Sequence, residues 1–171
     1  WSCQKVSPGC THCYAERLNV RFGGPSYVVG ADTLRLDERA LTEPLRWRTP
    51  RRIFVCSMTD LFEERVPDEW IDRIFDVMIE APHTFQLLTK RAERMCQFVT
   101  WWSVPALTDR MLENIWLGVS AETQQYADER IPWLLKTPAA VRFISLEPLL
   151  GPVDLTRLAI AQPGSPPGAI R

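Results

Sequence analysis

The chain has 171 residues, of which 46% are hydrophobic and 24% charged, the balance of one soluble globular domain. Its formal net charge of -1 excludes a global attraction to nucleic acid or anionic lipid, so any nucleic-acid contact must be local. The sequence shows no signal peptide and no apolar run near the roughly 18 residues of a membrane span. We therefore expect a cytoplasmic protein with no membrane partner.

The first element is a cysteine-rich loop that leads into a helix-like segment over residues 11–23. Three of the five cysteines, Cys3, Cys10 and Cys13, lie in this loop, with six residues between the first two and two between the last two. In a reducing compartment, clustered thiols are more often metal ligands or catalytic groups than disulfides. The spacing lets all three reach one metal ion or cluster.

Four short apolar runs follow, of the kind that form strands buried on both faces of a parallel sheet. They cover residues 51–58, 83–90, 114–122 and 140–148. Segments with helical spacing lie between them, at residues 67–81, 91–102 and 123–136. The alternation predicts an α/β fold with parallel strands, either an open doubly wound sheet or part of a (β/α) barrel.

Polar residues follow each predicted strand where it ends, and both architectures bind ligands at that edge of the sheet. These residues are Ser57, Asp60, Thr89, Lys90, Arg91, Ser120, Glu122, Ser145 and Glu147. The four groups together predict a ligand site at this edge. The alternative is that the carboxylates only cap helices or pair with nearby Lys and Arg.

Both ends of the fold are expected to be incomplete. No strand precedes the cysteine loop, no fifth or sixth strand follows Glu147, and a complete barrel needs about 250 residues. Residues 157–171 are rich in Pro, Gly and Ser, a composition typical of disorder. We therefore expect one incomplete domain over residues 1–156 and a disordered tail over residues 157–171.

Three thiolates leave one metal position open, which a catalytic or ligand-binding centre needs. A structural zinc site completed by His12, His83 or Cys56 is an alternative, as are unconnected thiols. The sequence alone leaves these possibilities open.

Six blocks of sequence resemble the phage gene-product thirty-seven/sixty-eight family, a three-cysteine group of phages and bacteria that is similar to radical S-adenosylmethionine (SAM) proteins. The blocks are KVSPGCTHCYAERL, RRIFVCSMTDLFEERVPDEW, HTFQLLTKRAERM, IWLGVSAE, YADERIPWLLKTPAAVRF and SLEPLLGPVDL. The resemblance implies a partial TIM-like (β/α) barrel of radical SAM type, with a [4Fe-4S] cluster on Cys3, Cys10 and Cys13.

The resemblance also implies SAM cleavage, an electron donor such as a flavodoxin or ferredoxin, and an unknown small-molecule or nucleic-acid substrate. Ser57 or Asp60 is then expected to contact the SAM amino group, and Ser120 and Glu122 its ribose hydroxyls. The residues expected to face SAM or substrate are Lys90, Arg91 and Glu147. The alternative function is a non-catalytic interaction protein stabilised by zinc or a cluster, or an inactive fragment of the enzyme.

A basic stretch, RWRTPRR at residues 46–52, places Trp47 among four arginines. Such a stretch suits a phosphate backbone with an indole stacked on a base. The alternative is a solvated loop at the opposite end of the strands from the ligand site.

Overall fold

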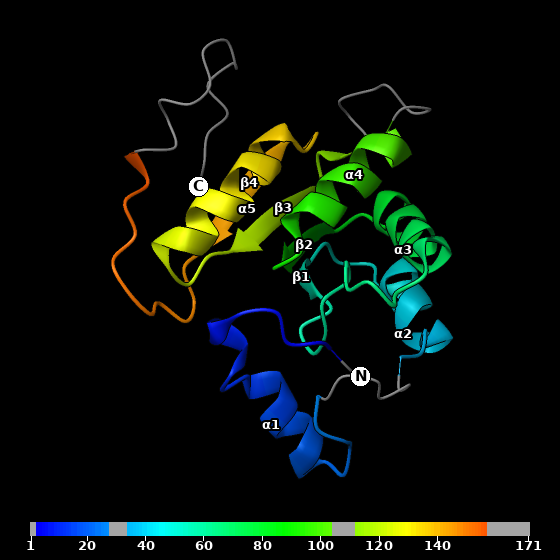
Figure 1. Cartoon of the computed structure of the whole chain (residues 1–171). Coiled ribbons are helices and arrows are strands. Elements are labelled where there is room, and N and C mark those ends of the chain that lie inside the picture. The colour runs from blue at the N-terminus through cyan, green and yellow to red at the C-terminus, as the bar shows by residue number, and fades with distance from the viewer. Residues whose placement is uncertain (1–2, 28–33, 104–111, 157–171) are drawn as a thin grey trace.

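The computed structural model describes residues 3–27, 34–103 and 112–156. Within them, a parallel sheet has the strand order β1-β2-β3-β4 (Figure 1). The strands are β1 (Arg52–Val55), β2 (Thr84–Thr89), β3 (Ile115–Ser120) and β4 (Val141–Ser145). Each lies inside one of the four predicted runs, which confirms the α/β class and the parallel sheet.

Helices connect the strands as predicted. The segments are η1 (Pro8–Cys10), α1 (Tyr14–Arg21), α2 (Glu38–Thr42), η2 (Glu43–Arg46), α3 (Asp68–Glu80), α4 (Ala92–Ser103) and α5 (Gln124–Lys136). The sequence analysis missed α2, whose five residues are too few for an apolar period. A carboxylate begins this helix instead, since Asp37 accepts hydrogen bonds from the backbone N–H groups of Arg39 and Ala40, both at 3.1 Å.

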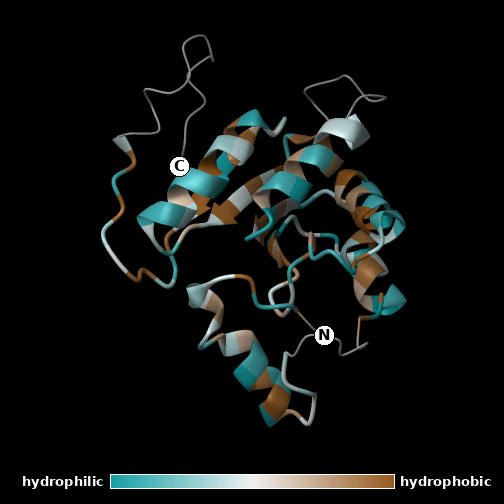
Figure 2. Cartoon of the chain, in the orientation of Figure 1, coloured by the Kyte–Doolittle hydropathy of each residue, from teal (hydrophilic) through white to brown (hydrophobic). Residues whose placement is uncertain are grey.

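The hydrophobic core lies between the sheet and α3, α4 and α5. Its members alternate along the strands and recur at helical spacing along the helices, which is why each segment forms its element. They include Ile71, Phe75, Met78, Phe85, Leu87, Phe98, Val99, Ile115, Leu117, Val119, Ile131 and Leu134, none more than 5% exposed. Figure 2 shows hydrophobic colouring on the strands and hydrophilic turns on the outer sides of α4 and α5.

The other face of the sheet is less covered. Phe54 is 45% exposed, and its neighbours in register, Gln86 and Trp116, are half-buried. On this face the ring of Phe143 lies against Gly118, where an added Cβ would come within 2.5–2.7 Å of three ring atoms. An alanine at position 118 would therefore force the Phe143 ring to move.

No helix in the described ranges is long and apolar enough to cross a membrane. The tail over residues 157–171, for which we predicted disorder, lies outside the described residues.

Candidate cofactor and metal site

The residues from Cys3 to Tyr14, here called the cysteine segment, reach the edge of the sheet where the strands end (Figure 1). The hydrogen bonds that hold it there include Arg91 Nη2 to the Gln4 carbonyl at 2.8 Å, the Gly9 N–H to Glu122 Oε1 at 3.3 Å, and the Tyr14 hydroxyl to the Ser57 carbonyl at 2.7 Å. The cysteines and the polar residues that follow the strands therefore belong to one region.

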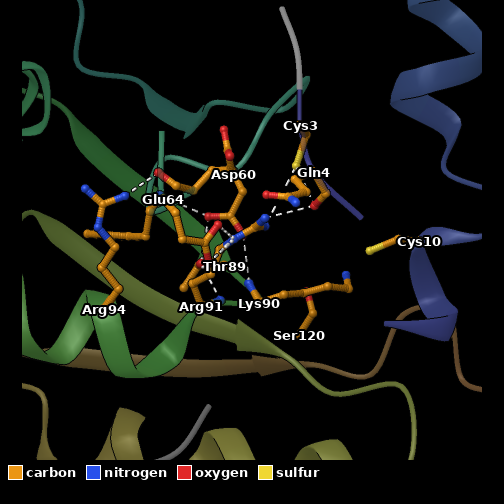
Figure 3. Close-up of polar contacts among 12 residues, drawn as sticks. Cys3, Gln4, Cys10, Asp60, Glu64, Thr89, Lys90, Arg91, Arg94 and Ser120 are labelled. Carbon is orange, nitrogen blue, oxygen red and sulfur yellow. Dashed lines mark hydrogen bonds and ion pairs between the residues drawn. The ribbon is translucent and has the colours of Figure 1, made fainter. Parts of the chain in front are cut away.

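Asp60 joins the loop after β1 to the end of β2. Its Oδ1 accepts from the Phe62 N–H at 3.0 Å and the Thr89 hydroxyl at 2.7 Å. Its Oδ2 accepts from the Lys90 N–H at 3.0 Å and from Arg91 Nη1 at 3.1 Å (Figure 3). The carboxylate is only 7% exposed and both oxygens are occupied. Its contact with SAM stays a prediction, and one of these donors would have to give way for it.

Arg91 is 8% exposed and lies at the centre of this network. Besides Asp60, its guanidinium contacts Glu64 at 3.3 Å and Cys3 Sγ at 3.9 Å (Figure 3). Burial opposes its charge, but Asp60, Cys3 and Glu64 outweigh that effect and raise the pKa of Arg91. Arg91 thus connects the first cysteine to the edge of the sheet.

Burial also governs the first cysteine. Together with the charge of Asp60, it raises the pKa of the Cys3 thiol to about 11, although Arg91 partly offsets the rise. Without a metal ion or cluster, Cys3 is therefore a protonated thiol at neutral pH.

Glu122, which follows β3, is fully buried and forms a second ion pair. Its Oε2 lies 3.0 Å from Arg130 Nη1, which also donates to the Ser120 carbonyl at 2.8 Å. The Arg130 guanidinium lies 4.2 Å from the ring centroid of Tyr126. Two elements, β3 and α5, thereby hold one carboxylate in a fixed position.

The charge of Glu122 is favoured in this environment. Burial opposes it, but hydrogen bonding from Ser7 and the charges of Arg130 and Lys90 prevail and lower the pKa of Glu122. The cysteine segment approaches this carboxylate closely, because a Cβ added to Gly9 would lie 3.0 Å from Glu122 Cδ. A glycine is therefore the residue that fits this contact.

The three cysteines of the segment are free thiols and all are half-buried. Cys10 Sγ lies 3.8 Å from Ser7 Oγ, and Cys13 directly precedes α1. In the described part of the chain, no three His, Cys, Asp or Glu side chains are grouped closely enough to hold a metal ion. The donor set fits a thiolate-bound metal centre chemically, although its sulfur atoms are not gathered around one point.

A family model described as a protein of unknown function (DUF5131) matches residues 1–168. The chain belongs to the DUF5131 family. No curated protein and no solved structure matches it.

Five of the predicted residues of this DUF5131 chain lie at the same edge, at the end of a strand or shortly after it. They are Ser57, Asp60, Lys90, Ser120 and Glu122. Ser57 is exposed, Lys90 is half-buried and Ser120 is 3% exposed. Figure 3 shows Lys90 and Ser120 together on the side of the site where Cys10 lies. Glu147 follows β4 but is exposed to solvent.

His83 and Cys56, two of the residues considered as a fourth zinc ligand, lie at opposite ends of the strands. His83 directly precedes β2, at the opposite end of the strand from the cysteine segment, and its ring nitrogens contact the Arg51 N–H at 3.3 Å and the Pro44 carbonyl at 2.9 Å. Cys56 follows β1 with a positive φ of 57°, and burial raises the pKa of its thiol to about 12. His12 is exposed within the cysteine segment itself.

The sequence analysis of the DUF5131 chain did not identify Arg130. A signal was present, because helical spacing from Ala127 and Leu134 places position 130 on the buried face of α5. An arginine on an apolar face needs a buried anionic partner, and Glu122 provides it.

Proposed function

We propose that this DUF5131 chain is an iron-sulfur protein of radical SAM type, with Cys3, Cys10 and Cys13 as ligands of a [4Fe-4S] cluster. The supporting observation is that three free, half-buried thiols lie on a segment tethered to the edge where the parallel strands end. Ligands bind at this edge in α/β proteins. The resemblance of six sequence blocks to a three-cysteine family supports the same function.

The strand order supports a partial (β/α) barrel over a doubly wound sheet. A doubly wound sheet reverses its strand order at the point where it binds its ligand. In the described residues the order β1-β2-β3-β4 follows the chain without reversal. In a (β/α) barrel each new strand is likewise added next to the preceding one, always in the same direction around the barrel.

When bound, the cluster supplies an electron that splits a sulfur-carbon bond of SAM, and with a hydrogen atom from the substrate the products are methionine and 5'-deoxyadenosine. The electron comes from a donor such as a flavodoxin or ferredoxin. The carboxylate of Glu122 is ionised and lies close to Ser120, but it is buried, so the Gly9 N–H would have to move away from Oε1 before a ribose hydroxyl could donate to it. Lys90 suits an anionic group of SAM or of the substrate.

The test is the iron, acid-labile sulfide and zinc content of the chain after anaerobic purification and reconstitution. We expect about four irons and four sulfides per chain, lost in a Cys10→Ser, Cys13→Ser variant. A matched control is Cys96→Ser, which removes a buried thiol of α4 outside the segment and should retain the iron. SAM binding should depend on the cluster, and 5'-deoxyadenosine should form with a reductant.

A zinc-stabilised interaction protein is the second candidate, favoured by the position of His12. This exposed imidazole lies between Cys10 and Cys13, so a fourth zinc ligand is available within the same segment. One zinc per chain without sulfide, and no affinity for SAM, would favour this function and contradict the first.

A further inference from the structure

A basic surface lies at the other end of the strands from the cysteine segment. Residues 44–52 carry four arginines and no acidic residue, in a chain whose net charge is -1. The four, Arg46, Arg48, Arg51 and Arg52, are all exposed. Among the described residues, no salt bridge includes any of them. Their charge is therefore available to a partner.

Aromatic rings lie directly beneath two of these arginines. The Arg51 guanidinium is 4.3 Å from the ring centroid of Trp47, and that of Arg52 is 5.2 Å from the ring centroid of Trp116 in β3. Both indoles are half-buried, so part of each remains accessible. The rings limit the motion of the guanidinium groups, which lowers the entropy lost on binding.

The backbone of this stretch is also fixed. His83, 3% exposed, bridges it through the Pro44 carbonyl and the Arg51 N–H, and its ring lies 5.7 Å from that of Trp47. The Arg51 carbonyl accepts from the Thr84 N–H at 2.9 Å. The arginines and indoles are thus held on a rigid support rather than on a free loop.

We propose that this basic-aromatic surface binds single-stranded nucleic acid. The surface comprises Arg46, Trp47, Arg48 and Arg51, and it continues through Arg52, whose guanidinium lies over Trp116 on the less covered face of the sheet. Arginines bind phosphate oxygens, while indole faces and guanidinium planes stack on unpaired bases. A membrane or an acidic protein would use the charges but not the stacking faces. The proposal goes beyond the iron-sulfur function and does not depend on it.

The test is fluorescence anisotropy of a labelled 12-nucleotide single strand with the anaerobically purified chain, over a series of salt concentrations. In an R46Q/R48Q/R51Q/R52Q variant we expect affinity to fall more than about tenfold, and the slope of log K against log salt to decrease in magnitude by about 3. The matched control replaces four other exposed arginines, Arg17, Arg21, Arg35 and Arg39, with Gln and should retain most of the affinity and slope.

A Trp47→Leu variant isolates stacking from charge. Loss of one stacked base should weaken binding about fivefold or more while the salt slope stays unchanged. Circular dichroism of each variant checks that the fold is retained.

The proposal would be overturned by an equal loss of affinity in the control variant, by an unchanged salt slope in the quadruple variant, or by no loss of affinity with Trp47→Leu. Binding to polyglutamate or to anionic vesicles as strong as binding to the oligonucleotide would also overturn it. None of these assays measures iron, so a negative result for nucleic-acid binding would not bear on the iron-sulfur proposal.

Discussion

Along the strands, Phe85, Leu87 and Ile115 are at most 2% exposed and pack beneath the helices, whereas in the cysteine segment Val6 and Tyr14 are 40% and 54% exposed. The core gains stability from burial of apolar surface. The cysteine segment is held mainly by hydrogen bonds, such as those of Gln4, Gly9 and Tyr14, each worth about 0.5–1.5 kcal/mol net. Stability of the fold and order of the segment should therefore be separable by mutation.

The largest effect is expected at Arg91, where the two regions meet. Arg91→Met leaves the buried carboxylate of Asp60 without its ion-pair partner and frees the Gln4 carbonyl. We expect the free energy of unfolding, measured by urea denaturation, to fall by about 3–5 kcal/mol. The control is Arg73→Met, which breaks an exposed ion pair with Glu38 and should change stability little. Equal stability of the two variants would contradict the central role of Arg91.

Glu122→Gln tests the second ion pair. At neutral pH it leaves Arg130 uncompensated, and we expect a loss of about 3 kcal/mol in the free energy of unfolding. Because folding lowers the pKa of Glu122, its contribution is present above the ordinary value of 4.5 and is lost as the pH falls through the lower folded pKa. The difference between the wild type and the variant should therefore narrow below pH 4.5.

Urea denaturation at a series of pH values measures this narrowing. A difference that stays constant down to the lowest pH at which the chain remains folded would show that the charge of Glu122 is not stabilising.

Gly118→Ala tests packing on the less covered face of the sheet without changing the cysteine segment. The new Cβ would lie 2.5–2.7 Å from ring atoms of Phe143, and overpacking of this kind costs about 1–3 kcal/mol. Thermal and urea unfolding should show the loss, while iron content should not change. Combining it with Phe143→Leu should recover part of the stability. The control Gly151→Ala places its Cβ in open space and should have little effect.

Gly9→Ala should produce the opposite pattern and the smallest change in stability, below about 1 kcal/mol. Its Cβ would lie 3.0 Å from Glu122 Cδ, and Arg130 prevents that carboxylate from moving easily. The segment should shift instead, so iron incorporation should fall while urea denaturation changes little. Unchanged iron content would mean that this close approach does not matter for the metal site.

The sequence predicted the repeated elements well, because apolar runs and helical spacing report burial directly. It also predicted that Ser57, Asp60, Lys90, Ser120 and Glu122 would share an edge, since parallel strands end together. Glu147 follows β4 and is exposed to solvent, and its expected contact with SAM or substrate stays a prediction.

The sequence did not predict which charges compensate each other. Asp60 pairs with Arg91, 31 residues away, and Glu122 pairs with Arg130 on a helix where only a stripe of apolar residues was expected. These pairs depend on distances that exist only after the sheet and α5 have packed. The short α2 was missed for another reason, since its start depends on one cap at Asp37.

The cysteine segment is synthesised before the residues to which Gln4, Gly9 and Tyr14 form hydrogen bonds. Each strand pairs with the one before it, so the sheet can grow from β1 as synthesis proceeds. The anchors of the segment, however, are made 43, 87 and 113 residues after the residues that they hold. The thiols are therefore synthesised long before their place in the fold exists, and during that interval they remain accessible to solvent.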